Sequence, residues 1–168
     1  MNWTVILIEM LVFAALFTIL VFFSYKDEQK YSIGSIHNYP PEIQAEYLKT
    51  HEPPPGGSTN KRDVVRKAIA IVVFAAIFVV MARLAGARTF WQGALFTFGM
   101  MAWIGVFDTF FIDWVLFANL KRFRLEGTEH MDEAYHQKWF HLKGMLFPGI
   151  IFTLIPAVLV GWLVTLLR

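Results

Sequence analysis

Three carboxylate side chains lie within apolar stretches of this chain, where charged residues are rare. Asp108 and Asp113 interrupt the stretch of residues 90–118, and Glu9 interrupts that of residues 3–24. A charge at the centre of a bilayer costs about 2.5–3.5 kcal/mol or more, so such groups face a bundle interior or water. They could hold a proton or another cation, or contact a lipid headgroup. The structural alternative is a hydrogen bond or ion pair between helices.

The spacing of these acids predicts how they point. Asp108 and Asp113 are five residues apart, which is about 140° around a straight α-helix, so they should not face the same way. Asp108 shares its face with Asn119 and lies about 7.5 Å deeper than Asp113. Glu9 and Arg83 fall at similar depth, which favours a structural ion pair between them. Alternatively, Glu9 is protonated or lines a path.

A second group of polar residues follows the third apolar stretch. Glu133 and His136 have the Glu-x-x-His spacing of di-iron helical bundles, which need two such pairs, and this sequence has one. A solvated helix face is the structural alternative. The sequence therefore requires no cofactor, and Glu133 with His136 is its only metal candidate. The full cytosolic cluster, with His37 from an earlier segment, comprises Glu129, Asp132, Glu133, His136, His141 and His37.

Several chemistries are excluded by what the sequence lacks. The chain has no cysteine, which rules out disulfides, thiolate zinc sites, cysteine-bound iron–sulfur clusters and thiol nucleophiles. Walker, GxSxG, HExxH and GxGxxG motifs are also absent from the sequence. The net charge of +2 is too small to indicate a nucleic-acid partner.

The composition is typical of a membrane protein. Of 168 residues, 57% are hydrophobic and 17% charged, against about 45–50% and about 25% in soluble domains. Four apolar stretches, residues 3–24, 64–85, 90–118 and 145–167, can each cross about 30 Å of hydrocarbon as a helix. Helices are expected because lipid offers the backbone no hydrogen-bond partner. The sequence predicts an all-α fold, with residues 1–168 forming one four-helix transmembrane bundle.

The basic residues predict the orientation in the membrane. Twelve of the fifteen lysines and arginines lie in or beside the segments 25–63 and 119–144; the other three are Arg83, Arg88 and Arg168. Positive residues concentrate on the cytosolic side, so both segments should be cytosolic and both termini outside. We expect a multi-pass protein of the cytoplasmic (inner) membrane. No basic residue precedes the first stretch, which favours a retained anchor over a signal peptide.

Each cytosolic segment is predicted to carry a short helix at the membrane surface. The first runs from Glu42 to His51, with Pro41 near its start. The second begins with Thr128 as N-cap and continues to about Lys143. Its amphipathic pattern predicts that it lies at the interface. The first helix places Ile43, Tyr47 and Leu48 on one side, and the apolar stripe of the second is Met131, Tyr135, Trp139 and Leu142.

Residues Phe111 to Gly144 resemble a pattern in small four-helix bacterial integral membrane proteins of uncharacterised activity. The resemblance covers about a fifth of the chain, and its residues are Asp113, Gly127-Thr128-Glu129, Met131, Tyr135-His136 and His141. It implies a cytoplasmic-membrane location and a polar motif after the third span. It implies no activity and assigns no site, although it adds weight to Asp113, Glu129, His136 and His141.

Three functional hypotheses follow. In the first, which we favour, the protein is not an enzyme: it binds or helps transport a small solute, ion or lipid around Asp108, or is an accessory subunit of a membrane complex. In the second it is a membrane-interface enzyme for a lipid-like substrate, using Asp113, Glu133, His136 and His141, with or without a metal. In the third it is purely structural. Beside the lipid bilayer, a homo-oligomer such as a homodimer or a larger complex is expected, because four helices enclose little interior.

Overall fold

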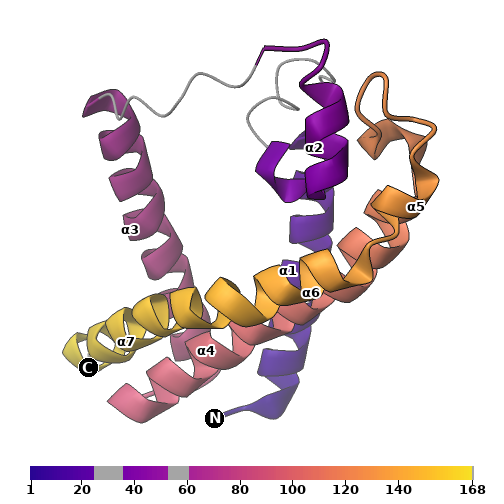
Figure 1. Cartoon of the computed structure of the whole chain (residues 1–168). Helices are drawn as coiled ribbons and strands as arrows, with labels where there is room; N and C mark the ends of the chain where they lie inside the picture. Colours follow the sequence, from indigo (N-terminus) through magenta and orange to yellow (C-terminus); the bar gives the residue numbers. More distant parts are fainter. Residues whose placement is uncertain (25–35, 53–60, 168) are drawn as a thin grey trace. The chain divides into compact units, whose positions relative to one another are not determined.

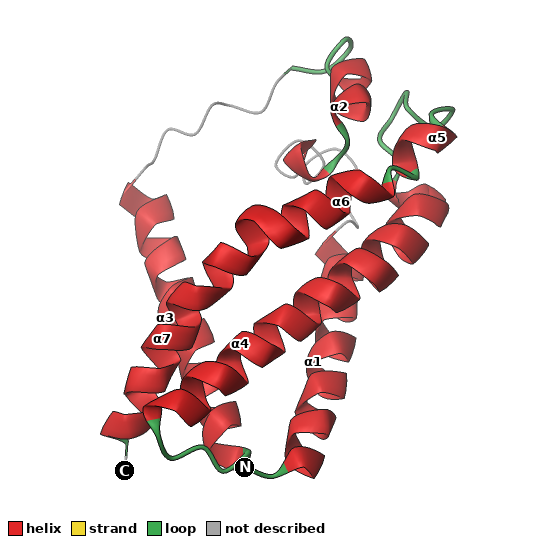
Figure 2. Ribbon diagram, turned by 60° about the horizontal axis from the view of Figure 1, so that its bottom comes forward, coloured by secondary structure: helices red, strands yellow, loops and turns green. Residues whose placement is uncertain are grey.

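Helices form every regular element in the described part of the chain, which comprises residues 1–24, 36–52 and 61–167 of a computed structural model (Figures 1 and 2). No strand occurs among these residues, so the predicted all-α class is confirmed. Residues 25–35 and 53–60 of the first predicted cytosolic segment lie outside the described residues. The elements are α1 (Trp3–Ser24), η1 (Ile36–Asn38), α2 (Pro41–Tyr47), α3 (Lys61–Leu84), α4 (Phe90–Phe107), η2 (Asp108–Phe117), η3 (Lys121–Phe123), α5 (Asp132–Tyr135), α6 (Lys138–Gly144), η4 (Met145–Gly149) and α7 (Ile150–Leu166).

Three helical runs are long and apolar enough to cross a membrane. They are Trp3–Phe23, Phe90–Phe117 and Asp132–Leu166, and they contain three of the four predicted spans. The remaining predicted span lies in α3, whose apolar part, Ala68–Leu84, is shorter. The described residues thus form an all-α membrane protein with three helices able to span a bilayer and a fourth, shorter apolar helix.

The chain divides into two compact units. The first unit comprises Met1–Ala14, Ser58–Gly105 and Leu146–Arg168, and the second comprises Ala15–Gly57 and Val106–Met145. In the first unit, parts of α1, α3, α4 and α7 enclose an apolar core. The buried residues of this core are Ile6, Phe78, Val79, Ala82, Ala85, Ala87, Phe96, Met100, Val160 and Val164.

The alignment of α1 with α3 explains why the predicted Glu9–Arg83 ion pair is wrong. The Asn2 amide donates to Ala85 O at 2.7 Å, and the Phe13 ring lies 6.3 Å from that of Phe74. The helices are therefore antiparallel, and Glu9 is level with residue 78. That is five residues, or about 7.5 Å along the axis, from Arg83. Both carboxylate oxygens of Glu9 and Nη1 of Arg83 are buried without a hydrogen-bond partner in the described residues.

Glycines allow α4 and α7 to pack closely. A Cβ on Gly93 would lie 3.0 Å from the Val164 side chain, and one on Gly161 would lie 2.9 Å from the Phe90 carbonyl oxygen. Gly93 and Gly161 therefore lie where α4 and α7 make close contact. Gly99, also in α4, differs, because a Cβ there would meet nothing within 4 Å.

A kink follows α6. Phe147 has an extended backbone, with φ −151° and ψ 116°. Phe147 immediately precedes Pro148, and a proline disfavours helical geometry in the residue before it. The helical geometry is thus interrupted just before Pro148, whereas α7 continues through Pro156.

The close packing of α4 and α7 yields a paired prediction. Gly161→Ala should lower the free energy of unfolding by about 1–3 kcal/mol relative to Gly99→Ala, because the added methyl group displaces a backbone carbonyl. Both changes replace a helical glycine by alanine, so the gain in helix propensity is the same in the two variants and cancels in their comparison. Thermal unfolding of the detergent-solubilised protein measures the difference. Equal unfolding temperatures for the two variants would contradict this packing.

Candidate functional site

The second unit contains a π-helix that carries the two aspartates of the third predicted span. η2 continues directly from α4, and the Ala118 amide at its end donates to the carbonyl of Asp113, five residues earlier. In a π-helix, residues i and i+5 are joined by this bond and stack one turn apart. Asp108 and Asp113 have this spacing, so they lie on the same side of η2. The expectation that they point apart assumed a straight α-helix and is overturned.

His141 of α6 completes the cluster. Its Nδ1 lies 3.0 Å from Oδ2 of Asp113, and the two side chains are 7% and 19% exposed. Asp108 is half-buried and lies close enough to interact electrostatically with both. The sequence placed Asp113 in the membrane group and His141 in the cytosolic group. The tertiary structure brings them into one site, and we call these three residues the Asp–His cluster.

The Asp–His cluster has an imbalance of charge. Two carboxylates face one imidazole, and no lysine or arginine of the described residues forms an ion pair with either aspartate. Nε2 of His141 is buried and has no hydrogen-bond partner in this part of the chain. Buried charges and buried polar atoms are costly when they lack partners. The cluster is therefore built to accept a cation or a proton.

Aromatic rings surround the histidine and limit its access to water. The Phe117 ring centroid lies 5.4 Å from the His141 ring, and that of Phe140 lies 5.1 Å away. On the same helices, Lys138 Nζ sits 5.1 Å from the Trp114 ring centroid. An apolar surrounding of this kind strengthens electrostatic interactions within the cluster.

Phe117 also belongs to a buried core formed by the two segments that are predicted to be cytosolic. We call residues 36–52 and 121–136 the cap. Tyr39 Oη donates to Phe123 O at 3.0 Å, and the Phe117 ring lies 4.9 Å from that of Tyr39. The two segments therefore meet in space, which the sequence did not predict. The buried members of this core are Ile36, Tyr39, Ile43, Tyr47, Phe117, Phe123, Leu125 and Tyr135.

The first predicted surface helix is largely confirmed as α2. Pro41 occupies the first turn, as expected, and Ile43 and Tyr47 are buried in the core of the cap. The helix ends at Tyr47 rather than at His51, and Leu48 is 37% exposed instead of sharing the buried face.

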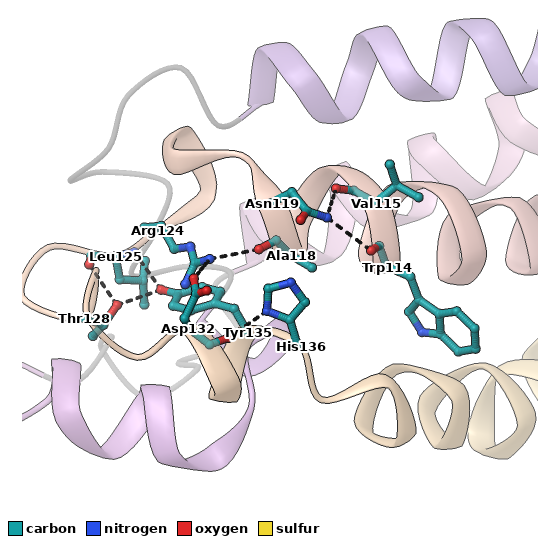
Figure 3. Close-up of polar contacts among 10 residues, drawn as sticks. All are labelled: Trp114, Val115, Ala118, Asn119, Arg124, Leu125, Thr128, Asp132, Tyr135 and His136. Atoms are coloured by element: carbon teal, nitrogen blue, oxygen red, sulfur yellow. Dashed lines mark hydrogen bonds and ion pairs between the residues drawn. The ribbon is translucent and has the colours of Figure 1, made fainter.

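A buried polar network holds the second segment of the cap (Figure 3). Thr128 Oγ1 donates to Leu125 O at 2.8 Å and lies 2.6 Å from the Tyr135 hydroxyl. That hydroxyl accepts the Leu125 amide at 2.9 Å. Arg124 binds both Ala118 O and the Asp132 carboxylate. The Asn119 amide, a predicted membrane site residue, donates to Val115 O at 2.8 Å and so closes the end of η2.

The predicted helix from Thr128 to Lys143 is wrong. Thr128 does not cap it, and the chain forms α5 and α6, separated at His136 and Gln137. The apolar stripe is split accordingly, because Tyr135 is buried whereas Trp139 is 70% exposed. The break has a physical reason. Phe117 contacts both Tyr135 and His141, which on one continuous helix would be about 9 Å apart along the axis and about 120° apart around it.

The other members of the predicted cytosolic cluster do not join His141. Glu129, Glu133 and His37 are exposed, and Asp132 is paired with Arg124. His136 Nδ1 lies 2.8 Å from the backbone carbonyl of Asp132 in its own turn. No three histidine, aspartate or glutamate side chains of residues 1–24, 36–52 and 61–167 are placed to hold a metal ion. Nothing in these ranges completes the Glu133–His136 pair.

Comparison with known proteins adds no functional assignment. No protein-family model matches this chain, and neither a curated protein nor a solved structure matches it significantly. The functional argument therefore depends on the geometry of the Asp–His cluster and of the cap above it.

The polar network of the cap yields a matched pair of threonine substitutions. Thr128→Val should lower the free energy of unfolding by about 1–3 kcal/mol, because it leaves the buried Tyr135 hydroxyl with an unmade bond. Thr50→Val removes an exposed hydroxyl from the same cap and should change stability by less than about 0.5 kcal/mol. Amide hydrogen exchange at Leu125 gives a local measurement and should accelerate only in Thr128→Val. Unchanged protection in that variant would refute the network.

Proposed function

We propose that this chain is a four-span membrane protein that binds a small cation at the Asp–His cluster and helps move it across the bilayer. One observation carries the proposal: two carboxylates lie on one side of a π-helix, opposite a buried histidine whose second nitrogen has no hydrogen-bond partner among the described residues. Ionisable groups within membrane spans are by default candidates for ion pathways and proton relays. Short π-helical segments occur frequently at functional sites.

The first unit supports four crossings rather than three. Asn2 bonds to Ala85 at the turn between α3 and α4, and Phe90 beyond that turn contacts Trp162 of α7. Both termini and this turn therefore lie at one end of the unit (Figure 1). An even number of spans is needed to bring both termini to one side. The 17-residue apolar part of α3 is at the short end of the range for a span, about 17–25 residues.

The distribution of tryptophan and basic residues supports an orientation. Trp3, Trp91 and Trp162 are each more than 60% exposed and occupy the end of the first unit that holds both termini. Exposed tryptophans favour the membrane interface, and lysine and arginine favour the cytosol. From the basic residues of the cap we infer that it faces the cytosol at an inner membrane, with both termini outside. A second copy or a larger complex would enlarge the small interior of four helices.

Asp108→Asn tests the cation site. At alkaline pH, where Asp108 is ionised, the change keeps the shape of the side chain and removes a charge that has no ion-pair partner among the described residues. We expect the unliganded protein to melt at least about 2–4 °C higher, the shift that 1 kcal/mol produces in a chain of this size. Stabilisation of the wild type by Na⁺, K⁺, Mn²⁺ or acid should be lost in the variant, because only a bound cation raises stability by mass action. Thermal unfolding in mild detergent measures both effects.

Glu133→Gln is the matched control, since Glu133 is an exposed carboxylate outside the cluster. It should change neither the melting temperature nor its dependence on cations. A purely structural role for Asp108 predicts the reverse for Asp108→Asn: a lower melting temperature and an unchanged response to cations. That result would contradict the proposed function.

The second candidate function is a membrane-interface enzyme. The specific observation in its favour is that a carboxylate holds Nδ1 of His141 and leaves Nε2 without a partner, as in an oriented general base. Incubation with vesicles of phosphatidylglycerol or phosphatidylethanolamine, followed by mass spectrometry, would detect lipid products. On this hypothesis, His141→Gln should abolish turnover. An absence of lipid products with the wild type would contradict the enzymatic function.

A further inference from the structure

We propose that the cation is a proton, and that Asp108, Asp113 and His141 form a relay that carries it along η2 towards the cap. This inference rests on the proposed function and names the ligand of the same site. It requires that the cluster suit a proton better than a metal ion, that its members be ordered in space, and that no neighbouring charge already neutralise it.

The ligand set favours a proton over a metal. Zinc sites in proteins take three or four side-chain ligands. No such group of three is placed to bind a metal within the described ranges. A proton needs no coordination sphere: one oxygen or nitrogen holds it, and a neighbouring atom within hydrogen-bond distance can receive it. Nδ1 of His141 and Oδ2 of Asp113, at 3.0 Å, form such a pair.

Charge balance fixes the number of protons at rest. With the imidazole neutral and both carboxylates ionised, the cluster carries two negative charges in an apolar surrounding. Two protons bring it to zero: one on His141, giving an ion pair with Asp113, and one on Asp108. A buried site of zero net charge avoids the cost of an unpaired charge. The resting state therefore has a protonated Asp108 beside an ion-paired Asp113 and His141.

The charged and titratable groups on the packed elements leave this balance intact. On α6, Lys138 lies over Trp114, and Lys143 is exposed. In the cap, Arg124 is held by the Asp132 carboxylate. The cap residues that touch Phe117 are Tyr39, Phe123 and Tyr135, and the tyrosines are neutral near pH 7. None of these groups supplies a fixed positive charge to Asp108.

The order of the groups gives the relay a direction. Along η2, Asp108 comes first, Asp113 one π-turn later, and then Phe117, which contacts both His141 and the cap. The proton of Asp108 passes to the carboxylate of Asp113, which still accepts a hydrogen bond from His141 Nδ1–H. Asp113 then holds the extra proton, and His141 releases one from Nε2 towards the cap. The neutral imidazole keeps its Nδ1 proton and turns its vacant Nε2 to Asp113, which passes the extra proton to it. Asp108 is reprotonated from the far side, so every proton is accounted for.

Infrared spectroscopy of the full chain in lipid nanodiscs tests the resting state. A protonated carboxylic acid has a carbonyl stretch distinct from that of a carboxylate. We expect this band at neutral pH in the wild type and its loss in Asp108→Asn. Both oxygens of Glu9 also lack partners, so the comparison is made in a Glu9→Gln background. The control Glu133→Gln should keep the band. Retention of the full band in Asp108→Asn would overturn the assignment.

Proton flux into liposomes containing a pH-sensitive dye tests the relay. Imposing a potential should drive acidification by the wild type. His141→Gln and Asp113→Asn should each slow it about a hundredfold, the lower end of what a positioned acid–base group contributes. Unchanged Leu125 amide protection in each variant shows that the cap still folds. Wild-type flux in His141→Gln would overturn the relay.

The two proposals fail in different ways. If no protonated carboxyl band and no flux are seen, but Na⁺, K⁺ or Mn²⁺ stabilises the wild type and not Asp108→Asn, the cation site stands and the proton inference falls. If acid and all three metal ions also leave stability unchanged, both proposals fall.

Discussion

The site depends on one backbone constraint: between Asp108 and Phe117 the chain hydrogen-bonds from residue i to i+5 instead of i+4. This winding stacks Asp113 beneath Asp108, where an α-helix would separate them by about 140°. It also sets where Phe117 stands relative to Asp113. Because Phe117 touches both His141 and the cap, the same winding that brings the two aspartates together also links them to the cap.

The break between α5 and α6 depends on the same residue, Phe117. Tyr135 fills the cap core and shares its hydroxyl with Thr128 and Leu125, while His141 turns to Asp113. A continuous helix could not present both residues to Phe117. Because the helix is broken into two short helices, a buried hydroxyl network and a buried acid–base pair can both form around the Phe117 ring.

In the first unit, packing has the opposite character, because close contact of small residues replaces polar bonding. Gly93 and Gly161 bring α4 and α7 together. This is expected of helices in lipid, where no hydrophobic driving force brings them together and close packing takes its place. Glu9 and Arg83 remain unpaired in this setting. The Asn2 hydrogen bond and the Phe13 contact fix the register of α1 against α3. The approximate depth of each residue in its span, which is all that the sequence gives, could not show that Glu9 and Arg83 are offset by five residues.

The sequence by itself determined the all-α class, the apolar helices and the start of α2 at Pro41, and it singled out Asp108, Asp113 and His141 as candidate site residues. Each of these depends on composition, local spacing or the cost of a charge in hydrocarbon. The tertiary structure alone decided that Asp113 and His141 meet, that Thr128 is a buried donor rather than a helix cap, and that α5 and α6 are separate. The i to i+5 spacing of the aspartates was the one available signal of a shared face. It could not be used, because whether a helix winds as α or π depends on the packing of residues such as Phe117 and Tyr135, which are distant in sequence.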